Sequence, residues 1–109
     1  MEKRRAHHNL EDIKAQFSDP ELLSSITVSA RNDARALGFS DEDIVLVIQN
    51  LMPRNLYKSM TSYHDHTLWQ DVYWSAYRNV NLYVKFTAGE DGSYWLLSFK
   101  EKEQQERNP

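Results

Sequence analysis

Apolar side chains recur every three or four residues through the first half of the chain, which is the spacing of amphipathic helices. Leu10, Ile13 and Phe17 form the first such stripe, directly after Asn9. Asparagine is well suited to capping a helix N-terminus, because its side chain accepts a hydrogen bond from a free backbone N–H. The pattern predicts a short helix that ends before Pro20, since proline disfavours helical backbone angles in the residue before it.

A second helix is expected to follow an extended segment. Residues 22–28 are rich in β-branched side chains, which favours a short strand or an extended link. Thr27 or Ser29 can cap the helix that comes next. Gly38 stands where a left-handed residue would close this helix.

A third helix is predicted between Ser40 and Pro53. Asp41–Asp43 fill its first turn, where carboxylates favour the positive end of the helix dipole. We prefer this interpretation of the acidic run over a metal site. The apolar stripe of the helix consists of Ile44, Val47, Ile48 and Leu51.

After Pro53 the apolar period changes from helical to alternating, which is typical of half-buried strands. The sequence GEDG at 89–92 favours a hairpin turn between the last two strands. Helices followed by an antiparallel sheet define an α+β fold, with the helices packed on one face of the sheet. We expect strands over residues 55–62, 68–74, 81–88 and 93–100.

Alternation also sorts the strand residues between the two faces, because neighbours on a strand point in opposite directions. The sets expected to face the helices are Leu82, Val84 and Phe86 on one strand and Trp95, Leu97 and Phe99 on the next. The opposite face then gathers polar side chains, with Met60 beside the first of them: Lys58, Gln70, Tyr83, Lys85 and Lys100.

This group of Lys, Tyr and Gln limits the chemistry. It contains no pair of carboxylates, so it does not resemble a glycosidase. His64 and His66 would share a strand face, but no third metal ligand is evident, so we predict no metal and no cofactor. Lysine can offset charge that builds on a phosphate, and Tyr or Lys can move protons, so an RNA phosphodiester is a suitable substrate. The alternative is that these lysines have no catalytic role, since lysines on edge strands also protect against aggregation.

Composition places the chain among small single domains. It has 109 residues, 40% of them hydrophobic, and no cysteine. We expect one domain over residues 1–109, with 1–8 and 103–109 flexible because they are charged. No apolar run is long enough for a signal peptide or a membrane span, so we expect a cytoplasmic protein.

The net charge of −3 argues against a broad electrostatic binder of duplex nucleic acid. Residues 1–53 carry six Lys or Arg against nine Asp or Glu, while residues 54–109 carry seven of each. The acidic excess therefore belongs to the helical half. The sheet half is balanced and leaves room for a local basic patch.

Three segments resemble the motility quorum-sensing regulator toxin family (MqsR): LYKSMTSYHDHTLWQDVY at 56–73, LYVKFTA at 82–88 and LLSFKEK at 96–102. The resemblance is dense over about half of the chain and weak before residue 50. It implies a RelE-like α+β fold. It also implies an mRNA interferase, the toxin of a type II toxin–antitoxin system. Such a toxin cuts free mRNA at a short sequence, GCU in the best-known member, and arrests growth.

The resemblance also implies roles for particular residues. Lys58, Gln70, Tyr83 and Lys100 match the positions implicated in catalysis in the family. We expect Met60, Lys85 and Arg78 to contact RNA. The implied reaction is attack of the RNA's own 2′-hydroxyl on the adjacent phosphate, which leaves a 2′,3′-cyclic phosphate.

The segment at 74–80, WSAYRNV, departs from the family pattern, so the GCU preference should not be assumed. We expect a loop here. Its side chains Trp74, Tyr77 and Arg78 are available to contact unpaired bases, and the alternative is that the loop packs against the sheet.

The family's partner is an antitoxin. In the known pair the antitoxin is MqsA-like, with an N-terminal zinc-binding domain and a C-terminal helix-turn-helix domain. A free sheet edge would suit strand addition by such a partner. Two further hypotheses are a non-catalytic module on the same fold that binds RNA or the antitoxin, and a scaffold whose sheet serves only assembly.

Overall fold

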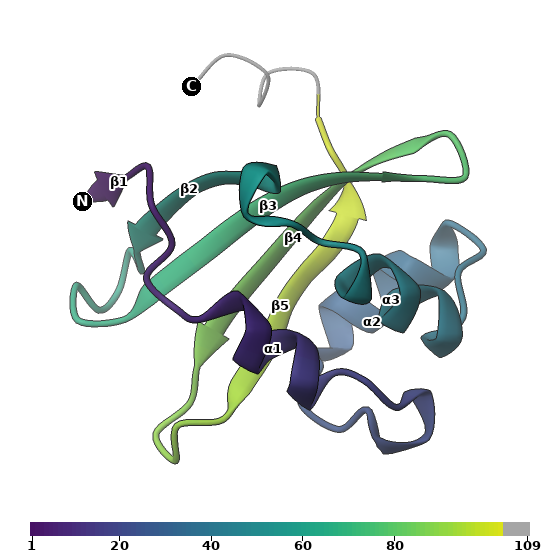
Figure 1. Cartoon of the computed structure of the whole chain (residues 1–109), viewed down its shortest axis with the longest axis horizontal. Coiled ribbons are helices and arrows are strands. Elements are labelled where there is room, and N and C mark those ends of the chain that lie inside the picture. The colour runs from purple at the N-terminus through teal and green to yellow at the C-terminus, as the bar shows by residue number, and fades with distance from the viewer. Residues whose placement is uncertain (104–109) are drawn as a thin grey trace.

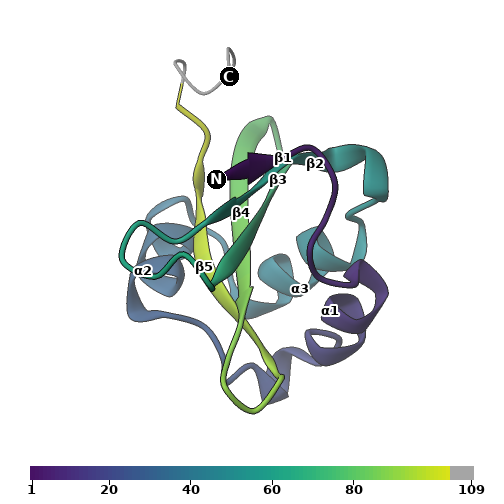
Figure 2. The ribbon, with the colours of Figure 1, turned by 90° about the vertical axis from the view of Figure 1, so that its left-hand side faces the viewer.

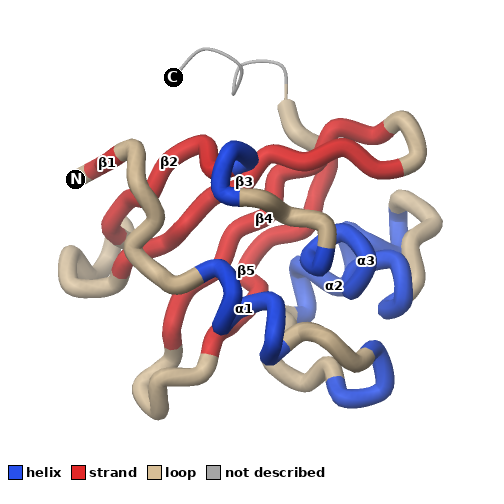
Figure 3. Tube along the Cα trace, in the orientation of Figure 1, coloured by secondary structure: helices blue, strands red, loops and turns tan. Residues whose placement is uncertain are grey.

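The computed structural model describes residues 1–103, and a five-stranded antiparallel sheet forms its centre (Figure 1; Figure 3). The strands lie side by side in sequence order: β1 Glu2–Lys3, β2 Leu56–Thr61, β3 Trp69–Tyr77, β4 Val80–Ala88 and β5 Tyr94–Glu101. The α-helices are α1 Leu10–Gln16, α2 Val28–Ala36 and α3 Asp41–Gln49, and 3-10 turns occur at Pro20–Leu22 and Pro53–Asn55. The predicted α+β fold is confirmed. None of the described helices combines the length and the apolar content that crossing a membrane requires.

Local caps explain why the helices begin where the sequence predicts. Asn9 accepts from the N–H of Asp12 at 3.0 Å, and Thr27 caps α2 through the N–H of Ala30 at 3.1 Å. Ser40 and Asp43 form a reciprocal capping box at the start of α3. Gly38 follows α2 with a φ of 84°, a left-handed conformation that glycine adopts without steric cost.

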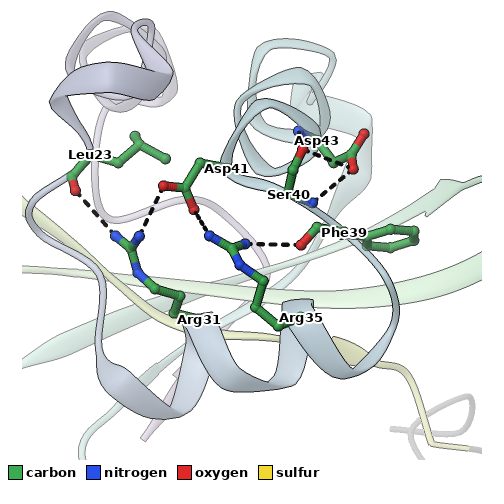
Figure 4. A network of polar contacts seen from close by, with 7 residues as sticks. All are labelled: Leu23, Arg31, Arg35, Phe39, Ser40, Asp41 and Asp43. Carbon is green, nitrogen blue, oxygen red and sulfur yellow. Dashed lines mark hydrogen bonds and ion pairs between the residues drawn. The ribbon is translucent and has the colours of Figure 1, made fainter.

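Charged contacts lock α2 to the start of α3. The Arg31 guanidinium donates to a carboxylate oxygen of Asp41 at 2.9 Å, and Arg35 donates to the other oxygen (Figure 4). The same arginines also reach backbone carbonyls, those of Leu23 at 3.2 Å and Phe39 at 2.9 Å. Partial burial alone would raise the pKa of Asp41, but the hydrogen bonds and charges of Arg35 and Arg31 outweigh it and hold that pKa below its ordinary value. These contacts fix the position of α2 relative to α3, the last α-helix before strand β2.

The core lies between one face of the sheet and the helices α1 and α3, which Figure 2 shows on the same side, and α2 joins it beside β5. The small residues Ala30 and Ala34 let α2 approach β5 closely, and both are fully buried. The predicted stripes of α1 and α3 point into the same core. On the sheet side the fully or almost fully buried apolar residues are Tyr73, Leu82, Val84, Phe86, Leu96 and Phe99.

Strand β5 contains a bulge that alternation from the sequence did not reveal. Lys85 pairs with Ser98, but its neighbour Phe86 pairs with Leu96, so Leu97 is the extra residue. The expectation that Trp95 and Leu97 face the helices is therefore wrong. Leu96 occupies the core with no exposed surface, and Trp95 is exposed on the opposite face.

The expected loop at 74–80 is also wrong, because β3 and β4 continue to a tight hairpin. The register runs to Tyr77 opposite Val80, which leaves Arg78 and Asn79 as a two-residue turn. Their φ angles are 49° and 66°. Two successive positive φ values match a type I′ turn, whose twist fits the strands of a hairpin.

Both edges of the sheet are partly covered, because β1 is a short edge strand on one side and an isolated bridge joins Ile26 to Leu96 on the other. The segment before α2 runs along β5, where the N–H of Leu96 donates to Ser25 at 2.9 Å and the N–H of Thr27 donates to Leu96 at 3.1 Å. At the other edge β1 pairs with β2, with Glu2 opposite Met60.

The N-terminal segment, expected to be frayed, is held against the sheet by a buried carboxylate. Asp71 has no exposed surface, and it accepts from the hydroxyl of Ser59 at 2.6 Å. It also accepts from the backbone N–H groups of His7 at 3.1 Å and His8 at 2.8 Å. We call residues 1–8 the N-terminal strap. The expected flexibility of 103–109 falls, after residue 103, outside the described residues.

Replacing Asp71 with Asn should loosen the strap and destabilise the fold by about 3 kcal/mol, because buried donors lose a charged acceptor. Urea unfolding would measure the loss, and hydrogen exchange at the amides of His7 and His8 should accelerate. Asp91→Asn is the matched control, since the Asp91 carboxylate binds Ser93 in the exposed β4–β5 hairpin. Equal stability of the two variants would contradict the role given to Asp71.

Candidate active face of the sheet

One face of the sheet points away from α1 and α3 (Figure 2). It carries the predicted polar group, in three rows of residues paired across the strands. We call these rows the open face. The first row is Trp74, Tyr83 and Lys100. The second is Lys58, Val72, Lys85 and Ser98, and the third is Met60, Gln70, Thr87 and Trp95. All the predicted site residues except Arg78 therefore share one face.

In the first row Tyr83 and Lys100 are directly paired, and the Lys100 Nζ atom lies 5.1 Å from the centroid of the Tyr83 ring. Tyr83 is only 9% exposed, so its position is fixed by its neighbours. A phenol and an ammonium side by side provide both a proton-transfer group and a positive charge. This pair therefore brings two reactive groups together on the open face.

Trp74 lies beside this pair, directly opposite Tyr83 on the neighbouring strand. The ring of Tyr57 stacks on it, with centroids 4.0 Å apart and an interplanar angle of 19°. The Lys102 Nζ atom lies 4.3 Å from the same indole. It must be on the other side, because the Tyr57 ring fills the first. Both faces of Trp74 are therefore covered, and it does not offer a surface on which a base can stack.

Lys58, in the second row, already has an anionic partner. Its Nζ atom lies 3.0 Å from a carboxylate oxygen of Glu2 in the strap, and 5.2 Å from the centroid of the Tyr57 ring. The Lys58 side chain is 19% exposed and that of Glu2 54%. The hydrogen bond from Lys58 holds the pKa of Glu2 below its ordinary value. Any anion that binds Lys58 must compete with Glu2.

The strand order sets the span of the site. Neighbouring strands lie about 4.8 Å apart and alternate residues about 7 Å apart along a strand, which places Lys58 and Lys100 about 16 Å apart at Cα. They can approach one ligand only from opposite sides. Tyr83 and Lys85 lie on β4, between them, and occupy the middle of the open face.

Arg78 lies apart from the three rows. It stands in the β3–β4 turn, and its guanidinium lies 3.2 Å from the carboxylate of Asp43 at the start of α3. The Tyr77 hydroxyl donates to the same carboxylate at 2.6 Å. This hydrogen bond is the main reason why the pKa of Asp43 falls below its ordinary value of 3.8. The contacts of Arg78 are thus directed toward the helices.

Sequence reasoning missed Glu2, Tyr57 and Lys102. Alternation past Lys100 would have placed Lys102 on the same face, so that signal was present. The sheet face of Tyr57 could not be assigned from alternation, because the β2–β3 register shifts between Leu56 and Lys58. Glu2 had no local signal, since its place depends on a contact with a strand more than fifty residues away.

Within residues 1–103 no group of three His, Cys, Asp or Glu side chains is placed to hold a metal ion. His64 and His66 lie on the exposed connection between β2 and β3. The polar groups on the open face include lysine ammonium groups, the Tyr83 phenol and the Gln70 amide.

Fold and site together define a small α+β protein with a basic and aromatic sheet face suited to a phosphodiester. The family model described as "Motility quorum-sensing regulator, toxin of MqsA" matches residues 5–101. The chain is also similar to the mRNA interferase toxin MqsR of Escherichia coli (strain K12), with 38% identity over 102 residues that cover 94% of this chain and 100% of the relative. The chain belongs to the MqsR toxin family, which confirms the resemblance seen in the sequence motifs.

The Asp43 contacts predict a pH dependence of stability. Because the pKa of Asp43 is lower in the folded state, its ionised form stabilises the fold above pH 3.8, and this contribution disappears as the pH falls through the folded-state pKa. Asp43→Asn should therefore be less stable than the parent at pH 7, and the difference should shrink below pH 3.8.

Urea unfolding between about pH 3 and pH 7 would measure both proteins across this range. Glu42→Gln is the control, because it removes an exposed charge from the same helix turn. A stability gap between parent and Asp43→Asn that stays constant with pH would refute the assignment.

Proposed function

We propose that this endoribonuclease toxin cuts single-stranded mRNA on the open face, without a metal ion or the ribosome, and is neutralised by a cognate antitoxin. The observation that carries the proposal is the pairing of Tyr83 with Lys100 on a face that also bears Lys58 and Lys85. Family membership supports the toxin function, and the relative is named as an mRNA interferase. We propose a GCU-like site as the first candidate for the cleavage sequence, which is read from the products.

The reaction we propose is an internal transesterification. The ribose 2′-oxygen attacks the adjacent phosphorus and loses its proton to a base, while the P–O5′ bond breaks and the 5′-oxygen takes up a proton. The products are a 2′,3′-cyclic phosphate and a 5′-hydroxyl. Negative charge builds on the non-bridging oxygens in the transition state, so fixed cations accelerate the step.

The geometry divides the roles. Tyr83 exchanges the proton, because it lies at the centre of the face beside a cation. Lys100 and Lys85 flank it on β5 and β4 and stabilise the phosphate charge. Lys58 approaches from the β2 side after it releases Glu2. Gln70 and Met60 are directly paired at the far row and contact the nucleotide.

For the partner, we propose an MqsA-like antitoxin with a zinc-binding N-terminal domain and a helix-turn-helix C-terminal domain. The family description names the toxin by its antitoxin partner. Strand addition at β2 would require the partner to displace β1, which pairs through Glu2 and Lys3. Displacement is feasible because β1 is so short, and it would also free Lys58 from Glu2.

The ion pair of Lys58 favours a second candidate, a module that binds RNA or the antitoxin without cutting. In that case Glu2 would hold Lys58 permanently as a structural pair. Cleavage assays distinguish the two candidates directly.

Purified protein should cut a long mixed-sequence RNA in the presence of EDTA, and the fragments should carry 2′,3′-cyclic phosphate ends. Lys100→Ala and Tyr83→Phe should each slow cleavage by about 100-fold, since each removes one transition-state contribution. Arg54→Ala is the control, because Arg54 is an exposed cation outside the open face. RNA left intact by a folded parent protein would favour the binding module instead.

Glu2→Gln should strengthen binding to an uncleavable, 2′-deoxy-substituted oligonucleotide, because it releases the Lys58 ammonium for a phosphate. The binding constant should then fall more steeply with salt, by about 0.7 in the log–log slope for one more phosphate contact on a single strand. The matched control is Glu11→Gln, which makes the same charge change on the exposed surface of α1. Identical slopes for the two variants would show that Glu2 does not compete with RNA.

A further inference from the structure

A groove at the end of the third row adjoins the open face. It has a volume of about 390 Å³, within the usual range for small-ligand pockets. It lies between the ends of β2 and β3 and the connection that joins them. Its lining includes Met60, Thr61, Tyr63, His66, Gln70 and Lys85.

We propose that this groove binds one unpaired nucleobase of the RNA, next to the phosphate that is cut, with the Tyr63 ring as the stacking surface. This inference rests on the proposed function, because it names a subsite of the same reaction. It makes Tyr63 and His66 specificity residues, a role that the sequence motifs did not give them.

The groove has the chemistry that recognition of an unpaired base requires: an aromatic plane, an amide and an apolar floor. Gln70 supplies an amide that can both donate and accept, and within residues 1–103 this amide forms no hydrogen bond. Met60 supplies the apolar surface. Lys85 stands where the groove meets the middle of the open face, on the side of the phosphate.

Tyr63 is an aromatic side chain of the groove with most of its surface exposed. It is 90% exposed, and its ring contact among the described residues is a T-shaped one with His64, with centroids 5.4 Å apart. Tyr57 and Trp74, in contrast, are stacked on each other. A tyrosine left this exposed gains little for folding, whereas stacking on a base would bury its ring.

The connection that carries Tyr63 is internally braced. Asp65 accepts from the N–H of Thr67 at 2.9 Å and from its hydroxyl at 2.6 Å. The N–H of Ser62 donates to the carbonyl of Leu68 at 2.8 Å, which closes the base of the connection. The short turn therefore holds Tyr63 and His66 beside the groove at little further cost in entropy on binding.

The test is sequencing of the cut sites in an RNA library with random sequence. We expect the parent to prefer a particular base at one position beside the cut. Tyr63→Ala should weaken that preference about tenfold, as expected for the loss of one stacked base, whereas Tyr63→Phe keeps the ring and should retain it. Leu68→Ala is the matched control, because Leu68 is 43% exposed on the same connection and does not line the groove. Since Tyr63 is exposed, these variants should fold like the parent, which circular dichroism would check.

A double-mutant cycle, which combines Tyr63→Ala with removal of the base, tests the same contact without cleavage. Removing the base at that position from an uncleavable, 2′-deoxy-substituted oligonucleotide should weaken parent binding about tenfold and should not weaken Tyr63→Ala further. If Tyr63→Ala keeps the parent's cut-site preference and the full abasic penalty, the base subsite is refuted while the nuclease stands. A folded parent that cuts no RNA would refute the proposed function itself.

Discussion

The buried carboxylate of Asp71 is the contact on which the arrangement of this molecule depends. An ionised side chain without exposed surface is costly unless hydrogen bonds satisfy it. Here Ser59 and the backbone N–H groups of His7 and His8 do so. The carboxylate lies on the helix side of β3, yet it determines what happens on the open face. By fixing the strap it sets β1 beside β2 and brings Glu2 to Lys58.

Aromatic contacts strengthen the same attachment. The ring of His7 stacks on Trp69, with centroids 5.0 Å apart and an angle of 13°, and the Lys3 Nζ atom lies 4.3 Å from the indole. The ring nitrogen Nε2 of His8 lies 2.9 Å from the backbone oxygen of Trp69. The N-terminal strap is thus held by Trp69 and Asp71. These residues are two positions apart on β3, so both face the helix side. This is why a segment with few apolar residues can still be ordered.

The helices and the residues of the open face were predictable because their signals are local. Caps such as Asn9 and Ser40 act within one turn, and alternation depends only on neighbours. The errors arose where distant contacts decide. Leu97 is a bulge residue, and its carbonyl accepts from the hydroxyl of Thr27, seventy positions earlier. Lys100 was still assigned to the correct face of the sheet, because the bulge precedes it and the alternation is regular from Ser98 onward.

The net charge of the chain hides how that charge is distributed between the two layers. Acidic residues gather at the start of α3, where Asp41 is held by arginines of α2 and Asp43 accepts from the Tyr77 hydroxyl of β3. Lysines gather on β2, β4 and β5 and line the open face. At the edge of this face the Glu2 carboxylate offsets the charge of Lys58. The open face therefore carries an excess of positive side chains although the whole chain is negative, so the net charge of the chain does not describe the charge of this surface.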